Sequence, residues 1–382
     1  MFRDVQRERL RVSTKRETKL TRMVTSSDLN GSLEELCRKL QASLKIDHLL
    51  SLTDHIALLQ HAKFSVPARK EGYAVDDSAR ALVFAARAGR LWPDQRLAKL
   101  TRKLLSFILL MQDEDGKLHN LMDSSQRIID EPTVGDHLGR AIWATGRVIN
   151  SDLPIGMRAA ARSIFDRALP WARSSTSPRT QAYACLGLHE RLEAETDSNL
   201  QTNLREIADS LVALYQTNRM PDWNWFENIM TYDNARLSQA LLAAYQTLHD
   251  HVYLEVADES LQFLEKITII NETYVPIGSR GWYRKGGERA LYDQQPIEPG
   301  SMVEATTLAR RVTGSKSDER NMRQTLGWFF GLNTKSVRLY DESTGACYDG
   351  INEKGLNENQ GAESTLAYLL AAQAVIENLS KR

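Results

Sequence analysis

Acidic residues and aromatic rings alternate in the segment Pro221–Tyr245, which reads PDWNWFENIMTYDNARLSQALLAAY. Its first half places Trp223 and Trp225 close to Glu227, and an apolar helical pattern begins after Asp233. Aromatic faces that stack on sugar C–H groups, with carboxylates that bind hydroxyls, are typical of carbohydrate sites. The segment therefore indicates a sugar-binding loop at the start of a helix, or a hydrophobic turn whose acids cap that helix.

Cleavage of a glycosidic bond requires one carboxylic acid that protonates the leaving oxygen and one carboxylate that activates water or attacks carbon. The aromatic surroundings of Glu227 favour its protonated form, so we expect Glu227 to be the acid. Glu363 follows an amide-rich turn that favours its ionised form, so we expect it to be the base. Because the two come from distant segments, we expect a separation of about 6.5–9.5 Å and inversion at the anomeric carbon.

Asp77 and Asp233 are the next candidates for catalysis. Each is followed three residues later by an arginine, in Asp77-Ser-Ala-Arg80 and Asp233-Asn-Ala-Arg236. A helix cap or an ion pair between residues three apart explains this spacing equally well. The motif therefore supports a catalytic and a structural interpretation to the same degree.

Helical periodicity extends over nearly the whole chain from Ser32 and predicts an all-α protein. The second helix of each consecutive pair is apolar on nearly all faces, as in a helix surrounded by protein. The expected helical segments, in six pairs, are 32–62 (one or two helices), 78–89, 94–111, 133–149, 154–171, 179–192, 200–215, 232–248, 252–270, 298–312, 316–330 and 361–379.

A short repeat supports this pairing. The Asp77 and Asp233 motifs align directly, and His137-Leu-Gly-Arg140 fits the same frame more loosely, 60 residues after Asp77. A repeated helix pair predicts a closed ring or an open solenoid, and the long, unequal loops favour the ring. We therefore expect a single-domain (α/α)6 toroid with its site on the rim where the inner helices begin, since the positive helix ends favour carboxylates there.

The overall composition excludes several classes of protein. Lys plus Arg and Asp plus Glu each number 49, so the chain lacks the basic excess of many nucleic-acid-binding proteins. Its apolar stretches are shorter than the ~20 residues that cross a bilayer, and its start lacks the apolar core of a secretory signal. The three cysteines are far apart, as is usual for reduced thiols in a cytoplasmic protein. Residues 1–31 are basic and predict a flexible tail before a barrel domain at 32–382.

Four segments together resemble a bacterial family of (α/α)6-barrel proteins that are often fused to, or encoded beside, glycosyltransferase domains. These segments are YAVDDSARAL, WFENIMTYDNARLSQAL, YDQQPIE, and CYDG with GLNENQGAEST. The resemblance covers most of residues 50–378 and implies carbohydrate-active chemistry on a barrel similar to glucoamylase-like and cellulase-like glycoside hydrolases. It also implies association with a glycosyltransferase. The chain itself has no GxGxxG fingerprint and no P-loop.

We expect the substrate-binding residues to come from the repeat and from these four segments. For His137, a buried and hydrogen-bonded histidine is the commoner alternative. No metal or other cofactor is expected, because no His/Asp cluster recurs at ligand spacing. The expected binding residues are Asp76, His137, Arg140, Trp223, Trp225, Tyr232, Asn234, Arg236, Trp282, Gln295, Glu298, Tyr348, Asp349, Asn359 and Gln360.

Three functions fit these observations. The first is an inverting glycoside hydrolase that acts on an oligosaccharide or glycoconjugate. The second is a glycoside phosphorylase on the same barrel, in which Arg280, Arg284 and Lys285 beside Trp282 would bind phosphate. The third is a non-catalytic glycan-binding module that partners a glycosyltransferase. The many rim carboxylates favour the hydrolase.

Overall fold

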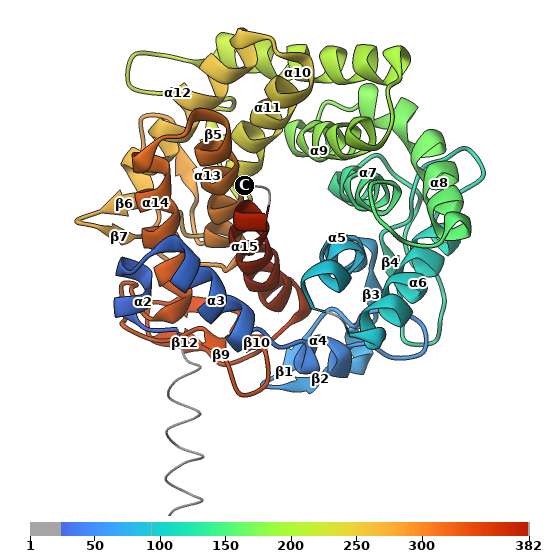
Figure 1. Ribbon diagram of the computed structural model, residues 1–382, viewed down its shortest axis with the longest axis horizontal. Coiled ribbons are helices and arrows are strands. Elements are labelled where there is room, and N and C mark those ends of the chain that lie inside the picture. The colour runs from blue at the N-terminus through green and yellow to red at the C-terminus, as the bar shows by residue number, and fades with distance from the viewer. Residues whose placement is uncertain (1–23, 93, 381–382) are drawn as a thin grey trace, which may run out of the picture.

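The computed structural model describes residues 24–92 and 94–380 and shows two concentric rings of helices (Figure 1). Each inner helix packs against both ring neighbours, and α15 contacts α5, so the ring closes. The structure therefore confirms the single-domain (α/α)6 toroid. The inner helices are α5 (Val75–Leu91), α7 (Asp136–Ile149), α9 (Pro178–Ala194), α11 (Ala235–Leu248), α13 (Ile297–Thr313) and α15 (Ala362–Ser380). The outer helices are α3 (Leu33–Ser43), α6 (Gln95–Leu110), α8 (Ile155–Arg173), α10 (Ser198–Asn218), α12 (His251–Thr268) and α14 (Lys316–Gly327).

The two rings differ in how much of each helix is buried. Every residue of α13 from Ile297 to Ala309 is buried, as its largely apolar sequence predicts. In α10 the buried positions, which include Leu200, Leu204 and Leu211, recur at helical spacing on one face. The inner helices therefore contact protein on all sides, whereas the outer helices expose their polar faces.

Glycines bring α7 and α9 into backbone contact. A Cβ atom on Gly146 would lie 2.3 Å from the carbonyl oxygen of Gly187, and one on Gly187 would lie 2.5 Å from that of Ile142. Such distances are far shorter than any real Cβ contact, so only glycine allows the two helices to approach this closely.

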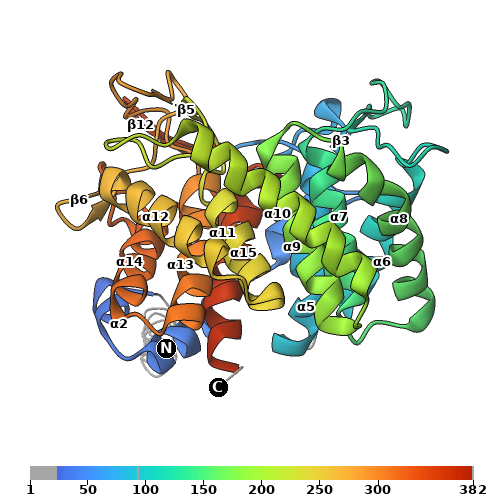
Figure 2. The same cartoon turned by 90° about the horizontal axis from the view of Figure 1, so that it is seen from above.

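The rim loops contain short strands that the helical periodicity did not predict. Figure 2 shows β3, β5 and β12 gathered at one end of the barrel. Strands of two or three residues are too short to leave a periodic pattern, so the sequence does not reveal them. The antiparallel pairs are β1 (Ala62–Lys63) with β2 (Val66–Pro67), β3 (Tyr73–Ala74) with β4 (Leu121–Met122), β5 (Ile229–Met230) with β8 (Tyr283–Arg284), β6 (Ile269–Ile270) with β7 (Thr273–Tyr274), β9 (Tyr340–Asp341) with β10 (Ala346–Cys347), and β11 (Gly350–Asn352) with β12 (Gly355–Asn357).

The loops that lead into the inner helices are long, with one exception. Residues 219–234, 269–296 and 328–361 connect α10 to α11, α12 to α13 and α14 to α15. Between α8 and α9, however, only residues 174–177 intervene. The α9 side of the rim therefore contributes no long loop to a site on the axis.

The N-terminal part of the described chain belongs to the folded body. The sequence predicts that residues 24–31 belong to the tail, but Val24 and Leu29 are buried and α2 (Ser26–Asn30) packs against α14. Arg323 donates a hydrogen bond to the Leu29 carbonyl at 2.9 Å. Residues 1–23, the rest of the predicted tail, lie outside the described residues. The predicted helical segment 32–62 is divided into α3 and α4 (Asp47–Leu52), followed by β1. Two short 3-10 helices, η1 (Arg69–Glu71) and η2 (Trp328–Phe330), complete the elements.

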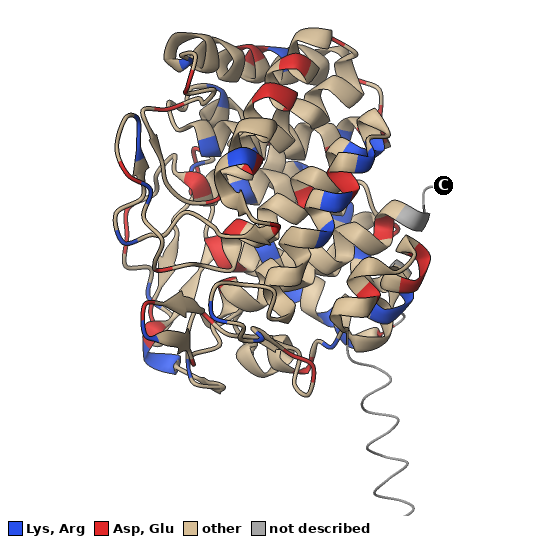
Figure 3. Cartoon of the chain, turned by 90° about the vertical axis from the view of Figure 1, so that its left-hand side faces the viewer, with Lys and Arg blue, Asp and Glu red and all other residues tan. Residues whose placement is uncertain are grey.

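Positions of Lys and Arg alternate with positions of Asp and Glu along the backbone on one side of the barrel (Figure 3). Figure 3 shows this mixture on the face that includes α14 and the rim loops beside it. Across residues 24–92 and 94–380, no helix is long and apolar enough to cross a membrane.

Candidate functional site

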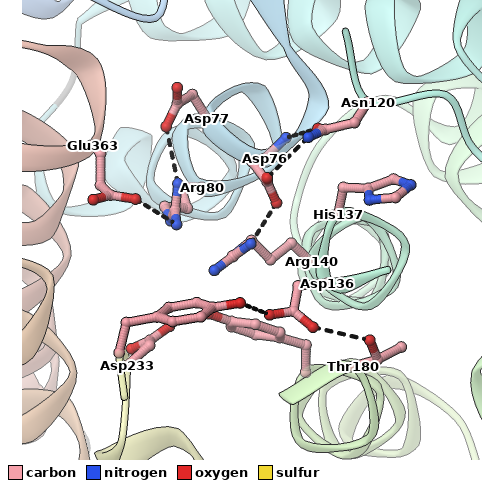
Figure 4. Close-up of polar contacts among 12 residues, drawn as sticks. Asp76, Asp77, Arg80, Asn120, Asp136, His137, Arg140, Thr180, Asp233 and Glu363 are labelled. Atoms are coloured by element: carbon pink, nitrogen blue, oxygen red, sulfur yellow. Dashed lines mark hydrogen bonds and ion pairs between the residues drawn. The ribbon is translucent and has the colours of Figure 1, made fainter. Parts of the chain in front are cut away.

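A polar cavity of about 340 Å³ opens near the N-terminal ends of α5 and α15. Four carboxylates and one arginine dominate its lining, and Figure 4 shows several of these side chains converging on the barrel axis. The positive ends of the two helices favour the carboxylates. The cavity is lined by Gln60, His61, Ala74, Asp76, Asp77, Arg80, Asn120, Gln295, Asp349, Asn357, Gly361, Glu363 and Ser364.

Asp76 is held in place by two elements. The Asn120 side chain, from the loop before β4, donates to Asp76 Oδ2 at 3.1 Å and accepts from the Asp76 backbone N–H at 3.2 Å. On the other side, the guanidinium of Arg140 in α7 forms a close ion pair with Asp76. Burial alone would raise the pKa of Asp76, but Arg140 and Arg80 outweigh it and hold that pKa below its ordinary value. Asp76 is therefore a fixed, ionised carboxylate.

Arg80 joins Asp77 to Glu363. Its Nη1 donates to Asp77 Oδ1 and its Nη2 donates to Glu363 Oε2, both at 2.9 Å. Asp77 is 7% exposed, whereas the Glu363 side chain is 39% exposed. One guanidinium therefore holds a buried carboxyl and a solvent-accessible carboxylate on the same cavity wall.

Asp76 and Asp77 are neighbours in sequence, but their surroundings move their pKa values in opposite directions. Burial raises the pKa of Asp77 to about 7, and the charges of Glu363 and Asp76 add to this effect against the opposing charge of Arg80. A carboxyl with a pKa near 7 beside an ionised carboxylate is the arrangement that supplies an acid and a base at neutral pH.

A second buried cluster lies across the axis from Asp76, around Asp233 (Figure 4). The Tyr183 hydroxyl donates a close hydrogen bond to Asp233, and Arg236 forms an ion pair with it at 3.3 Å. Glu298 accepts from the Asp233 backbone N–H and from the Asn234 side chain, so it caps the start of α11 from α13. Burial and then the charge of Asp233 raise the pKa of Glu298 to about 7. None of these side chains lines the cavity, so Asp233 is a buried structural partner and not a cavity acid.

The structure does not support Glu227 as the acid of the site. Glu227 does not line the cavity, and Arg179 of α9 donates to its carboxylate at 2.9 Å. The same arginine donates to the Tyr232 carbonyl at 2.6 Å, while the Tyr232 hydroxyl bonds closely to Asp136. This network fixes the loop before α11 against α9, which is a structural reason for the acid in that loop.

The aromatic residues of the same loop are core residues and not a sugar platform. Trp223 is 3% exposed and Trp225 is fully buried, and Trp223 packs edge-on against Phe263 at 5.6 Å between ring centroids. Buried rings offer no free face for stacking, so the predicted sugar-binding role of these two tryptophans is wrong. Trp282 and Tyr348 are half-buried and do not line the cavity either.

Three further predicted residues form hydrogen bonds with backbone groups of other segments. His137 is buried, and its Nε2 lies 2.9 Å from the Leu118 carbonyl, which is the commoner role for a histidine at this position. Asn359 Oδ1 accepts from the Phe64 backbone N–H at 2.9 Å, and the backbone N–H of Gln360 donates to the Phe64 carbonyl at 2.9 Å. Asn359 and Gln360 therefore position a rim hairpin beside the cavity.

Of the predicted site residues, five line the cavity: Asp76, Asp77, Gln295, Asp349 and Glu363. Sequence reasoning missed the residue that joins two of them, although the repeat places Arg80 in the same frame as Arg140 and Arg236. Asn357 and Gly361 belong to the amide-rich turn that the sequence places before Glu363. Sequence reasoning also missed Gln60, His61 and Asn120, which come from rim loops that only the ring brings together. Within the described residues, no group of three or more His, Cys, Asp or Glu is arranged to hold a metal ion.

No protein-family model matches the chain, and no curated protein matches it. Several solved structures share its architecture. A cellobiose 2-epimerase from Bacillus thermoamylovorans superposes with a TM-score of 0.72 at 9% identity, over 94% of this chain and 100% of that chain. A sugar epimerase from a ruminal bacterium gives 0.70 at 12% identity, over 88% and 99%. An inactive variant of a Salegentibacter α-1,6-mannanase, in complex with α-1,6-mannotriose, gives 0.58 at 12% identity, over 91% and 100%. At such low identity these likenesses establish the (α/α)6 toroid fold.

Proposed function

We propose that this protein is a glycoside hydrolase that acts on an oligosaccharide or glycoconjugate in the cavity between α5 and α15. The observation that carries the proposal is the convergence in one polar cavity of Asp77, a carboxyl whose pKa is about 7, with the ionised Asp76 and with the Glu363 side chain. In this proposal Asp77 replaces Glu227 as the general acid, and Glu363 keeps its predicted place as the base.

The proposed reaction assigns a proton transfer to each of these groups. Asp77 gives its proton to the glycosidic oxygen as the bond to the anomeric carbon breaks. Glu363 accepts a proton from the attacking water, because its side chain is the more exposed and a single hydrogen bond from Arg80 leaves part of it free. Asp76 remains ionised and stabilises positive charge that develops on the sugar ring. The sequence predicts inversion at the anomeric carbon for the pair Glu227 and Glu363; for the pair Asp77 and Glu363, proton NMR of the anomer that forms first tests whether cleavage inverts.

The mannanase offers independent support. Its inactive variant carries asparagine in place of two consecutive aspartates. This chain has the consecutive pair Asp76 and Asp77 at the start of α5, and both line the cavity. A consecutive pair that points to one cavity from a helix N-terminus suits acid-catalysed cleavage of a glycoside, since the two carboxyls have different charges.

A sugar epimerase is the second candidate. The two epimerases superpose with higher TM-scores than the mannanase does, and the cavity includes one imidazole, His61. Epimerisation beside a carbonyl requires a base that removes a carbon-bound proton and an acid that returns one to the opposite face. Asp77, whose pKa is about 7, and the His61 imidazole are the two groups in the cavity that we assign to this chemistry.

The three basic residues expected to bind phosphate in a phosphorylase do not lie at the cavity. Arg280 and Arg284 are exposed on the rim, and the Lys285 ammonium donates to the Asn218 carbonyl at 2.6 Å. None of the three lines the cavity. A glycan-binding module that partners a glycosyltransferase remains the alternative without catalysis.

One experiment separates these functions. The full chain is incubated in D₂O with cello-oligosaccharides and α-1,6-manno-oligosaccharides, and products are followed by NMR and by an assay for new reducing ends. Hydrolysis increases the number of reducing ends, with no deuterium on carbon. Epimerisation places deuterium at C2 of the reducing sugar, and the number of reducing ends is unchanged. Binding without either change contradicts both enzymatic proposals and supports the glycan-binding module.

A further inference from the structure

The hairpin β1–β2 presents an exposed phenylalanine beside the cavity. Lys63 pairs with Val66, so Phe64 and Ser65 form a two-residue turn. Phe64 is 54% exposed, so its ring is accessible from solvent. The hairpin lies on the part of the rim between α5 and α15 (Figure 1).

The backbone of Phe64 has a left-handed conformation with φ of 52°. The first position of such hairpin turns usually holds Gly, Asn or Asp, because a bulky side chain is strained at positive φ. Two hydrogen bonds keep Phe64 there: its N–H donates to Asn359 Oδ1 and its carbonyl accepts from the Gln360 N–H, both at 2.9 Å. A strained residue that its surroundings hold in place points to a functional role for its side chain.

The same hairpin is fixed to the catalytic segment. Gln60 and His61, which precede β1, line the cavity. The backbone N–H of Ala362 donates to the Gln60 carbonyl at 2.9 Å, directly before Glu363. Phe64 is therefore anchored through both its N–H and its carbonyl to the segment that leads into α15, the helix that carries the proposed base.

The size of the cavity implies that part of a long substrate lies outside it. A volume of about 340 Å³ is at the lower end of the range of about 300–1,000 Å³ typical of ligand pockets. A longer glycan must then extend over the rim, where an aromatic ring binds a sugar through contact with its C–H face.

We propose that Phe64 forms an outer subsite that stacks on a sugar ring of a bound oligosaccharide and makes the site selective for chains longer than a disaccharide. This inference rests on the proposed function, since it assigns a carbohydrate to the same cavity. In this proposal the Phe64 ring contacts the substrate, and the strained turn holds the ring toward the part of the oligosaccharide that lies outside the cavity.

The test compares variants that distinguish the contribution of the aromatic ring from that of the backbone conformation at residue 64. Phe64→Asn keeps a residue that tolerates positive φ but removes the ring, so Tm should be unchanged or higher. Affinity for cellotetraose or α-1,6-mannotetraose, by titration calorimetry on the full chain, should fall about three- to tenfold. Affinity for cellobiose or α-1,6-mannobiose should not change. Phe64→Trp should retain tetrasaccharide binding, and Val66→Ala, an exposed apolar change in the same hairpin, should have no effect.

Each outcome has a distinct meaning. If the wild-type protein and the Phe64→Asn variant bind the tetrasaccharide with equal affinity, the proposed subsite is overturned and the proposed hydrolase function is unaffected. An equal loss for the disaccharide and the tetrasaccharide, or a large fall in Tm, shows a structural role for the ring and also overturns the subsite. A wild-type protein that neither binds nor converts any of the four probes overturns the proposed function together with the subsite.

Discussion

Asp77 and Glu363 accept hydrogen bonds from the same guanidinium, although they come from the first and the last inner helix of the ring. Closure of the ring between α15 and α5 is what brings them to Arg80. The shared arginine therefore holds the Glu363 side chain beside Asp77, a buried carboxyl whose pKa is near 7. The predictions below follow from this relationship and from the packing that supports it.

Replacement of Asp77 should abolish most activity, whereas replacement of Glu227 should not. Asp77→Asn keeps the shape of the side chain but removes the transferable proton, so kcat should fall by about 10²–10⁴-fold. Glu227→Gln, which alters the acid held by Arg179 outside the cavity, is the matched control and should retain kcat within about threefold. Initial rates of cleavage of an oligosaccharide that the wild-type protein hydrolyses give kcat for both variants. The reverse pattern would restore Glu227 as the acid.

The activity should decline on the alkaline side of neutrality. Asp77 must be protonated to act as the acid, and its pKa is about 7. As pH rises through that value the protonated fraction falls, so kcat/KM should decrease about tenfold for each unit above it. A kcat/KM profile from pH 5 to 9 checks this. A profile that stays flat to pH 9 argues against Asp77 as the acid.

Glu298 should give stability a pH dependence of definite sign. Its folded pKa is about 7 and its ordinary value is 4.5. Between these values the folded state binds more protons than the unfolded state, so this stabilisation is complete below pH 4.5 and disappears as pH rises through 7.

Glu298→Gln removes this titration. Its Tm should lie below that of the wild type at pH 5, because the wild type there has the stabilising proton that the amide cannot gain. The deficit should shrink by pH 8, where the wild type has lost its proton. Thermal unfolding at the two pH values measures the change, and a deficit that grows with pH would contradict the assigned direction.

Helix α7 should not tolerate a side chain where it meets α9. Gly146→Ala places a Cβ 2.3 Å from the Gly187 carbonyl oxygen, so the helices must separate and the free energy of unfolding should fall by about 1–3 kcal/mol. Gly156→Ala, at the start of α8 with open space around it, is the control. That change should stabilise by up to about 1 kcal/mol, because alanine favours a helix. Urea unfolding measures both, and equal effects would refute the close contact.

The helical periodicity and the repeat determined the architecture and the start of each inner helix. The motif that begins at Asp77 recurs at Asp233 and, more loosely, at His137, and all three lie where inner helices begin. These features depend on residues within one helix or one turn, so a single sequence expresses them directly. The same locality explains why Asp76 and Asp77 were placed at the site without any knowledge of their partners.

Tertiary structure decided which of these residues face a cavity. The sequence shows that Trp225 and Glu227 are two residues apart, but only packing reveals that the ring is buried and that Arg179 holds the acid. Likewise, Arg80 reaches Glu363 only because the ring closes. Burial, ion pairing and pKa depend on neighbours that are distant in sequence, and ring closure brings these neighbours together.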